Sequence, residues 1–438
     1  MLADEIQVFV LLVLLACNLL CLLFFIEVRR SLLATTLSVV FFIADVSPQV
    51  FFLFFDFHHP LALLTPSNIF LEASVFVAGF LFMMVMSYSI GLMCFQALGV
   101  NFSLPHIQLY DHHIKPIWVI LFIYACSVIV TLTLIAQGSY VKLAEQTSGP
   151  FVQIGKALSE VNLLATVLYK LQLERQQIRR KEFKLLGGLL AALNFFIAIY
   201  SGSRTLFVVT AIIYLILYKN LLFNMRPITI LLTSLGAFFG AILFTVIGFF
   251  RGFRNDIELA IGVSDIMVDL IRDQGIAYFL IPAVKRLNYY DPVAKVIENY
   301  PDGSGLTELY LQNFVGLVPR LLWPGKPIIG YDSQSLAHDL GYVSLLDQTT
   351  SVGVGYIGEA FYVFGWKGVW IACAFGLFFA SVDRLLDVNE VVTRSIYIYF
   401  SVIVAFQFSY FSALPGFVMA LGVSFAVASL IHRKVEVA

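Results

Sequence analysis

The chain has 438 residues, of which 60% are hydrophobic and only 13% are charged, and it contains 42 Phe and 20 Tyr. A soluble domain carries about twice that charged fraction, so the composition excludes an ordinary soluble enzyme and predicts an all-α, polytopic transmembrane helix bundle. The net charge of −1 gives no electrostatic reason to expect a nucleic-acid partner.

The first apolar run follows a short segment that contains Asp4 and Glu5. A cleavable signal peptide begins with a basic region, so we interpret residues 6–26 as a retained membrane span. The five cysteines all lie in apolar runs, which predicts neither a disulfide framework nor a metal site.

Apolar runs near the roughly 20 residues needed to cross a bilayer recur along the chain, and they predict about 11 spans. Span five is the weakest because it contains Lys156 and Glu160, whose spacing suits either a mutual ion pair or a substrate-lining role. The predicted spans cover residues 6–26, 31–55, 69–95, 117–136, 151–171, 185–200, 205–222, 228–250, 369–386, 396–411 and 415–431.

These spans divide the chain by topology. Residues 1–250 hold spans one to eight, residues 251–352 form one long loop, and residues 353–438 hold spans nine to eleven. Lys and Arg gather in short loops at alternate span ends, for example at Arg29 and from Arg175 to Lys184. Because cytoplasmic loops carry this excess, we expect the N-terminus and the long loop outside and the C-terminus inside.

The long loop itself contains helical patterns. Residues 256–274 and 277–300 have apolar residues at helical spacing, which predicts helices lying on the membrane surface. Pro-Asp-Gly-Ser-Gly at 301–305 predicts a turn. No internal repeat is visible.

Cations on the outer side are the main chemical signal. Arg204 follows Ser-Gly-Ser between spans six and seven, Arg251 and Arg254 follow span eight, and Arg320 and Lys326 flank a Trp-Pro-Gly turn. Because an Arg fork matches phosphate oxygens, they predict a phosphate or pyrophosphate site. The alternative is that they reach lipid headgroups or pair with acids of the loop.

Glu359 is the second signal, because an acid is costly in the apolar, Gly-rich stretch at 353–365 that leads into span nine. It suits a general base or a ligand for sugar hydroxyls, and the alternative is a structural salt bridge to an arginine. His338 in the loop is a second candidate base.

Two adjacent histidine pairs, His58–His59 and His112–His113, invite comparison with metal sites. The predicted topology puts the two pairs on opposite sides of the membrane, so we expect no metal. No nucleophile elbow, phosphate-binding loop or dinucleotide fingerprint is present.

Three segments carry a family resemblance: Ser-Gly-Ser-Arg at 201–204, Val-Pro-Arg-Leu-Leu-Trp-Pro-Gly-Lys-Pro at 318–327, and Gly-Glu-Ala-Phe-Tyr-Val-Phe-Gly at 358–365. Together with the long outer loop, they resemble the Wzy-type O-antigen and oligosaccharide repeat-unit polymerases. The layout is similar to that of the enterobacterial common antigen polymerase. The likeness covers spans six to nine, while spans one to five match in hydropathy and count.

The resemblance implies a metal-independent glycosyltransferase without a cofactor in the bacterial plasma (inner) membrane, with its active site facing the exterior. It implies undecaprenyl-pyrophosphate-linked oligosaccharides as donor and acceptor, membrane lipids as surroundings, and a chain-length regulator and a flippase as partners. In this family arginines stand in place of a metal ion at the leaving pyrophosphate, so the segment at 313–330 is expected to fold back onto the bundle. The implied pyrophosphate ligands are Arg204, Arg251, Arg254, Arg320 and Lys326, with Arg204 and Arg320 also catalytic and Glu359 or His338 as the base.

Two other functions stay open. An O-antigen ligase would pass a finished glycan to a different acceptor and has similar hydropathy. A polysaccharide flippase or other transporter would be expected to place charged residues at mid-membrane and to have repeated halves, whereas here the charges cluster at one outer face and no repeat is visible.

Overall fold

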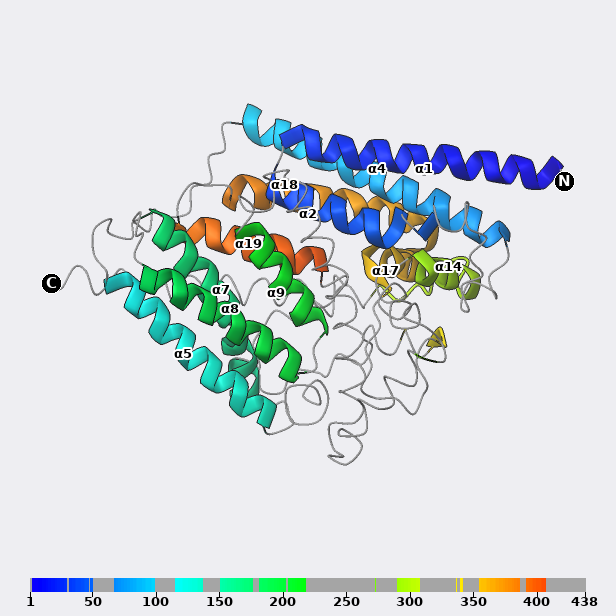
Figure 1. The fold of residues 1–438 in the computed structure, drawn as a ribbon. Coiled ribbons are helices and arrows are strands. Elements are labelled where there is room, and N and C mark those ends of the chain that lie inside the picture. The colour runs from blue at the N-terminus through cyan, green and yellow to red at the C-terminus, as the bar shows by residue number, and fades with distance from the viewer. Residues whose placement is uncertain are drawn as a thin grey trace. The chain divides into compact units, whose positions relative to one another are not determined.

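The structure is a computed structural model. It describes residues 2–29, 31–46, 48–49, 67–98, 115–136, 150–175, 181–201, 204–217, 272, 290–307, 336, 339–341, 354–386 and 391–406. Within these ranges every regular element is a helix (Figure 1). The predicted all-α class is therefore confirmed for the described part of the chain.

Membrane-spanning character is also visible in the described helices. Three shorter apolar helices accompany five that are long and apolar enough to cross a bilayer: Phe9–Glu27, Ile69–Ala97, Ile117–Leu134, Lys181–Tyr200 and Gly355–Leu386. Predicted spans eight and eleven and most of the long loop lie outside the described residues. The count of about 11 spans and the external loop therefore stay predictions.

The chain packs as two compact units. The first comprises Met1–Gln108 and Asn288–Ser429, and the second comprises Leu109–Leu287 and Leu430–Ala438. These boundaries follow helix packing, whereas the predicted division at residues 250 and 352 follows membrane topology and stays a prediction.

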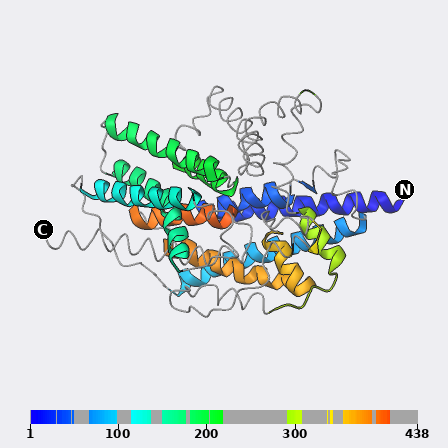
Figure 2. The same cartoon turned by 90° about the horizontal axis from the view of Figure 1, so that it is seen from below.

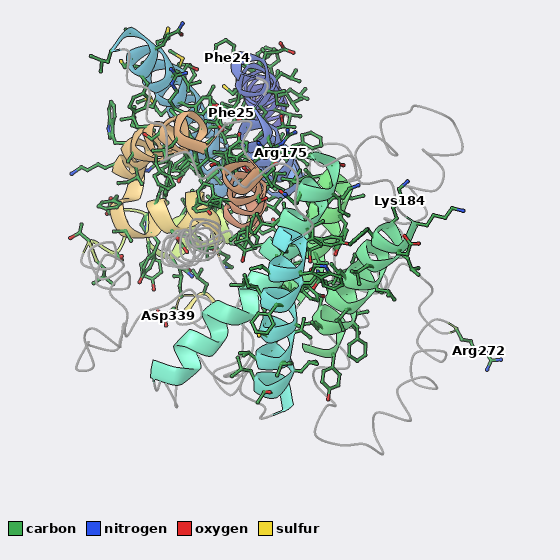
Figure 3. The ribbon with its side chains drawn as sticks, turned by 90° about the vertical axis from the view of Figure 1, so that its left-hand side faces the viewer. Phe24, Phe25, Arg175, Lys184, Arg272 and Asp339 are labelled. Atoms are coloured by element: carbon green, nitrogen blue, oxygen red, sulfur yellow. The ribbon has the colours of Figure 1, made fainter. Side chains whose placement is uncertain are left out.

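The first unit is built from apolar helices that run beside one another, as α1 and α4 do in Figures 1 and 2. Phe25 of α1 is fully buried and packs edge-on against Tyr88 of α4, with ring centroids 4.7 Å apart. Phe24 beside it is 52% exposed (Figure 3). The helices of this unit are α1 (Leu2–Arg29), α2 (Leu32–Phe41), η1 (Phe42–Val46), α4 (Ser67–Ala97), α14 (Tyr290–Asn299), α17 (Gly355–Phe364), η3 (Gly365–Trp370), α18 (Ile371–Leu386) and α19 (Val391–Phe406).

Helices α4 and α18 form the closest pair in this unit and run parallel. Gly79 lies beside Val369, and Gly91 lies beside Ala380. A Cβ atom on Gly376 would lie 2.8 Å from the backbone nitrogen of Tyr88. Small residues allow membrane helices to approach through their backbones and gain dispersion contacts, so Gly376 determines this spacing.

Among its described residues, the second unit has four helices joined by a polar centre. Asn194 accepts a 3.0 Å hydrogen bond from Tyr124 and donates bonds of 2.9 Å to Thr166 and 3.2 Å to Tyr214. Interhelical bonds of this kind contribute about 1 kcal/mol each inside a membrane. The four residues come from α5 (Lys115–Ala136), α7 (Pro150–Arg175), α8 (Lys181–Ser201) and α9 (Arg204–Leu217).

Helix α7 corresponds to predicted span five, and the side chains of Lys156 and Glu160 are not among those that the structure describes. Asn162, Thr166 and Gln172 of α7 are all buried inside the protein, so α7 needs less apolar surface than a helix that faces lipid. At the other end of this unit, Arg175 and Lys184 are exposed where α7 ends and α8 begins (Figure 3).

Candidate functional site

Glu359 is completely buried in the middle of α17, a ten-residue helix whose residues Gly355 to Val363 are all buried. Because successive residues of an α-helix are rotated by about 100°, Glu359 lies about 60° from both Tyr356 and Tyr362. Tyr356 donates a 2.5 Å hydrogen bond to the carbonyl of Val404 in α19. The sequence therefore identified a buried acid, and the structure places it between two anchored tyrosines.

Helix α17 ends at a sharp reversal. Gly365 has φ +57°, and a Cβ atom on Gly368 would collide with the carbonyl oxygen of Ala360. Farther from the reversal, the rings of Tyr356 and Phe375 are 5.5 Å apart. Nineteen residues of straight helix would separate these two by about 28 Å. The apolar stretch Gly355–Leu386 is therefore a hairpin of α17 against η3 and α18, where the sequence analysis expected a simple lead into span nine.

The predicted turn at 301–305 is confirmed, and it covers the end of α17. The Ser304 amide donates a 2.5 Å hydrogen bond to the carbonyl of Tyr362, and the Gly305 amide donates a 3.1 Å bond to Val363. These carbonyls belong to the last turn of α17, which has no helical partner for them. The ring of Tyr300 packs edge-on against Tyr362 at 5.0 Å. We call Tyr300–Gly305, together with Tyr362–Gly365, the outer clasp.

Helix α14, which leads into the outer clasp, is anchored to α4. The Tyr290 hydroxyl donates a 2.5 Å hydrogen bond to the carbonyl of Phe70 and lies 2.6 Å from the Ser74 hydroxyl. Val293 and Ala294 are fully buried, and α14 packs on α4 and α17. The sequence pattern at residues 277–300 predicts a helix on the membrane surface. In the described half of that segment, the apolar face covers protein instead.

Burial also governs the ionisation of the tyrosines near the outer clasp. Burial raises the pKa of Tyr290 well above its ordinary value, so this hydroxyl remains a neutral donor to Phe70. The pKa of Tyr300 is raised by burial first and then by Tyr362 and Asp339. Both side chains therefore act through packing and hydrogen bonds.

Arg204 is the first residue of α9, directly after α8 ends at Ser201. The tight hairpin between these helices is held by an apolar cluster in which Phe195 packs edge-on against Phe207 at 5.6 Å. A cation at a helix N-terminus is electrostatically unfavourable unless an anion lies nearby. Arg204 thus lies at the boundary between helices α8 and α9, and its predicted position between spans six and seven stays a prediction.

The remaining predicted site residues lie outside the described residues: Arg251, Arg254, Arg320, Lys326 and His338. Arg204 belongs to the second unit and Glu359 to the first. The expected closeness of Arg320 to Arg204 therefore stays a prediction, as does the fold of the segment at 313–330.

The expectation that the protein binds no metal likewise stays a prediction. Both histidine pairs, His58–His59 and His112–His113, fall outside the described residues. Among the residues that are described, no group of three or more His, Cys, Asp or Glu side chains is arranged to hold an ion.

A second buried carboxylate, Asp383 of α18, was not singled out in the sequence. It is fully buried and accepts hydrogen bonds from Tyr88 of α4 and, at 2.5 Å, from Tyr397 of α19. The Tyr397 hydroxyl in turn accepts a 3.1 Å bond from the Leu33 amide of α2. An acid inside a predicted span is itself a signal, and Asp383 lies within predicted span nine.

The Asp383 cluster also bears on topology. Its members come from the start of span two, the end of span three, the end of span nine and the start of span ten. Strict alternation of spans puts these four ends on one side of the membrane, and the structure brings them together. Which side that is stays a prediction.

Comparison with known proteins gives one match. The family model described as O-antigen polysaccharide polymerase Wzy matches residues 2–429, nearly the whole chain. No curated protein and no solved structure matches the chain. A match of this extent, on a chain whose described part is helical and includes several helices able to span a membrane, places it in a family of membrane enzymes of polysaccharide biosynthesis. The chain belongs to the O-antigen polysaccharide polymerase Wzy family.

Proposed function

We propose that this protein joins oligosaccharide repeat units carried on undecaprenyl pyrophosphate into a polysaccharide at the outer face of the bacterial plasma membrane. Family membership supplies the reaction class. The lipid carrier, the outer-face topology and the roles of individual residues are the parts that we propose.

The proposed reaction is a single glycosyl transfer. A hydroxyl on the non-reducing sugar of the acceptor attacks the anomeric carbon of the donor, and a new carbon–oxygen bond forms. The bond from that carbon to the pyrophosphate oxygen breaks, and undecaprenyl pyrophosphate leaves with the electron pair. Glu359 takes the hydroxyl proton. The glycosyl–pyrophosphate bond supplies the free energy, so no nucleotide is consumed.

The burial of Glu359 is the observation that best supports its assignment as the base. The side chain is fully enclosed in α17, on an element held by the outer clasp. A general base must reach its proton donor within hydrogen-bond distance, and an acid in an apolar stretch is costly unless it is paired or functional. His338 is the second candidate.

Arg204 is proposed as a ligand of the leaving pyrophosphate, with Arg251, Arg254, Arg320 and Lys326. Support comes from its position at the first residue of α9, where free backbone amides and the helix dipole attract anions. A bound pyrophosphate would offset the unfavourable charge of Arg204 at that position. Arginine forks would stabilise negative charge as it develops on the leaving group.

The test uses purified protein in lipid vesicles with synthetic undecaprenyl-pyrophosphate repeat units. The wild type is expected to produce a ladder of chain lengths without other proteins. The E359Q variant is expected to lower turnover by about 100-fold or more, which is the usual contribution of a general base. E359D, which keeps the carboxylate, should retain part of the activity.

The matched control is E298Q, the same chemical change in the neighbouring helix α14. Glu298 is half-buried and pairs with Lys295 at 2.5 Å, and its loss should leave turnover near that of the wild type. Full activity of E359Q would overturn the assignment of Glu359.

Two alternatives give different products. A ligase would form no ladder and would attach a preformed polymer to a separate acceptor. A transporter would move lipid-linked units across the vesicle membrane without extending them. Either result would overturn the proposed function.

A further inference from the structure

The antiparallel contacts between α17 and the segment after it define the depth of α17. Phe361 and Trp366 pack with ring centroids 5.8 Å apart, Gly368 lies against Ala360, and Tyr356 lies against Phe375. As the contacts move from Phe361 back to Tyr356 along α17, their partners move forward from Trp366 to Phe375 in the segment that follows. Because these contacts run antiparallel, the first residues of α17 lie farther from the reversal at Gly365 than its last residues do.

The reversal exposes a distinctive surface. Trp366 is 44% exposed, Trp370 is 67% exposed, and Lys367 between them is exposed as well. Trp366 is nevertheless held in place, because its ring packs edge-on against Phe76 at 5.8 Å and against Phe361. Tryptophans beside a lysine are the pattern found where membrane proteins meet the headgroup layer.

We propose that η3 is a lipid-headgroup anchor: Trp366, Lys367 and Trp370 contact the headgroup layer of one bilayer leaflet. Helix α17 then lies beside α18 within the bilayer, with its last residues near the headgroup layer and its first residues deeper. Tyr356 lies level with Phe375, about 7 Å deeper than Trp370 at 1.5 Å per residue. Glu359 lies between these levels, just beneath the headgroup layer.

The exposed face of α18 continues the same surface and supports a lipid occupant. Leu377 lies seven residues after Trp370 and is 46% exposed, so the two share one helix face. Helix α17 itself is enclosed by protein rather than by lipid. Every residue from Gly355 to Val363 is buried.

Depth-dependent quenching of tryptophan fluorescence tests the anchor. The chain has four tryptophans, and replacing Trp118, Trp323 and Trp366 with Phe leaves Trp370 as the single emitter. The protein is placed in vesicles of phosphatidylcholine brominated at either shallow or deep acyl positions. Trp370 is expected to be quenched at least twofold more by the shallow label.

The matched control carries W370F and L377W in the same background, so that the emitter moves about 10 Å along the same face of α18. Its quenching should be stronger with the deep label. A reversed order for Trp370, quenching by aqueous iodide alone, or no quenching at all would overturn the proposal. The last result would indicate that a protein partner covers η3.

This test is independent of the proposed function, because no substrate is present. A failed polymerisation assay would leave the fluorescence result standing, and a failed fluorescence test would leave the polymerisation assay standing.

Discussion

The backbones of Gly303 and Gly365 touch: a Cβ atom on Gly303 would lie 3.0 Å from the Cα atom of Gly365 and closer still to its nitrogen. Both residues have positive φ, of 78° and 57°. This contact joins the turn after α14 to the reversal after α17, so it closes the outer clasp around the helix that carries Glu359.

We expect G303A to disrupt the outer clasp and to lower polymerisation by tenfold or more, because alanine there is both strained and in steric conflict with Gly365. The measurement is turnover per folded protein in vesicles. The same variant should leave a shorter ladder in cells.

The neighbouring Gly305 provides the control. It also has positive φ, of 71°, but a Cβ atom there meets nothing within 4 Å. G305A therefore carries similar backbone strain without the collision and should stay within about threefold of the wild type, since strain alone costs roughly 1 kcal/mol. Equal losses in the two variants would contradict a role for the contact.

Replacing Asp383 should destabilise the protein. D383A removes the acceptor of hydrogen bonds from Tyr88 and Tyr397, and a buried donor left without its partner costs about 1–3 kcal/mol. We expect a clear fall in the thermal unfolding midpoint in detergent. S381A, two residues away, removes only a local 2.8 Å bond to Leu377 and should change little. An unchanged midpoint for D383A would rule out a structural role for the cluster.

Packing of α4 against α18 predicts a glycine-specific effect. G376A should reduce the yield of folded protein strongly, because its methyl group would meet the backbone of α4 near Met84 and Tyr88. G188A, in the middle of α8 with open space around it, should be neutral or slightly stabilising, since Ala favours helix more than Gly. Detergent-solubilised yield and unfolding temperature measure both effects.

R204A and R320A should leave protein levels intact but leave cells with glycan of single repeat units. R204K keeps the charge without the planar fork and should recover only part of the chain length. The control is R175A, an exposed arginine at the end of α7 in the same unit as Arg204. Normal ladders from both R204A and R320A would contradict the proposed pyrophosphate site.

The features that the sequence by itself determined depend on residues that are close together in the chain. Predicted span three at 69–95 corresponds to α4 at Ser67–Ala97, because a long apolar run satisfies its backbone polar groups only as a helix in lipid. The 301–305 turn followed from Gly and Pro preferences, and the cost of an acid among apolar residues drew attention to Glu359. These signals are all read within a few residues of one another.

Only the tertiary structure decided which distant segments meet. Tyr88 and Asp383 are separated by 295 positions, and Tyr290 and Phe70 by 220, and no local pattern links such pairs. From the sequence, residues 353–365 look like the entry to a membrane span. In the structure the chain reverses at Gly365 and forms a buried hairpin, because the turn at Gly303 supplies the amides that end α17. Hydropathy measures how apolar a stretch is, whereas packing and hydrogen bonding decide whether it crosses the membrane or folds back.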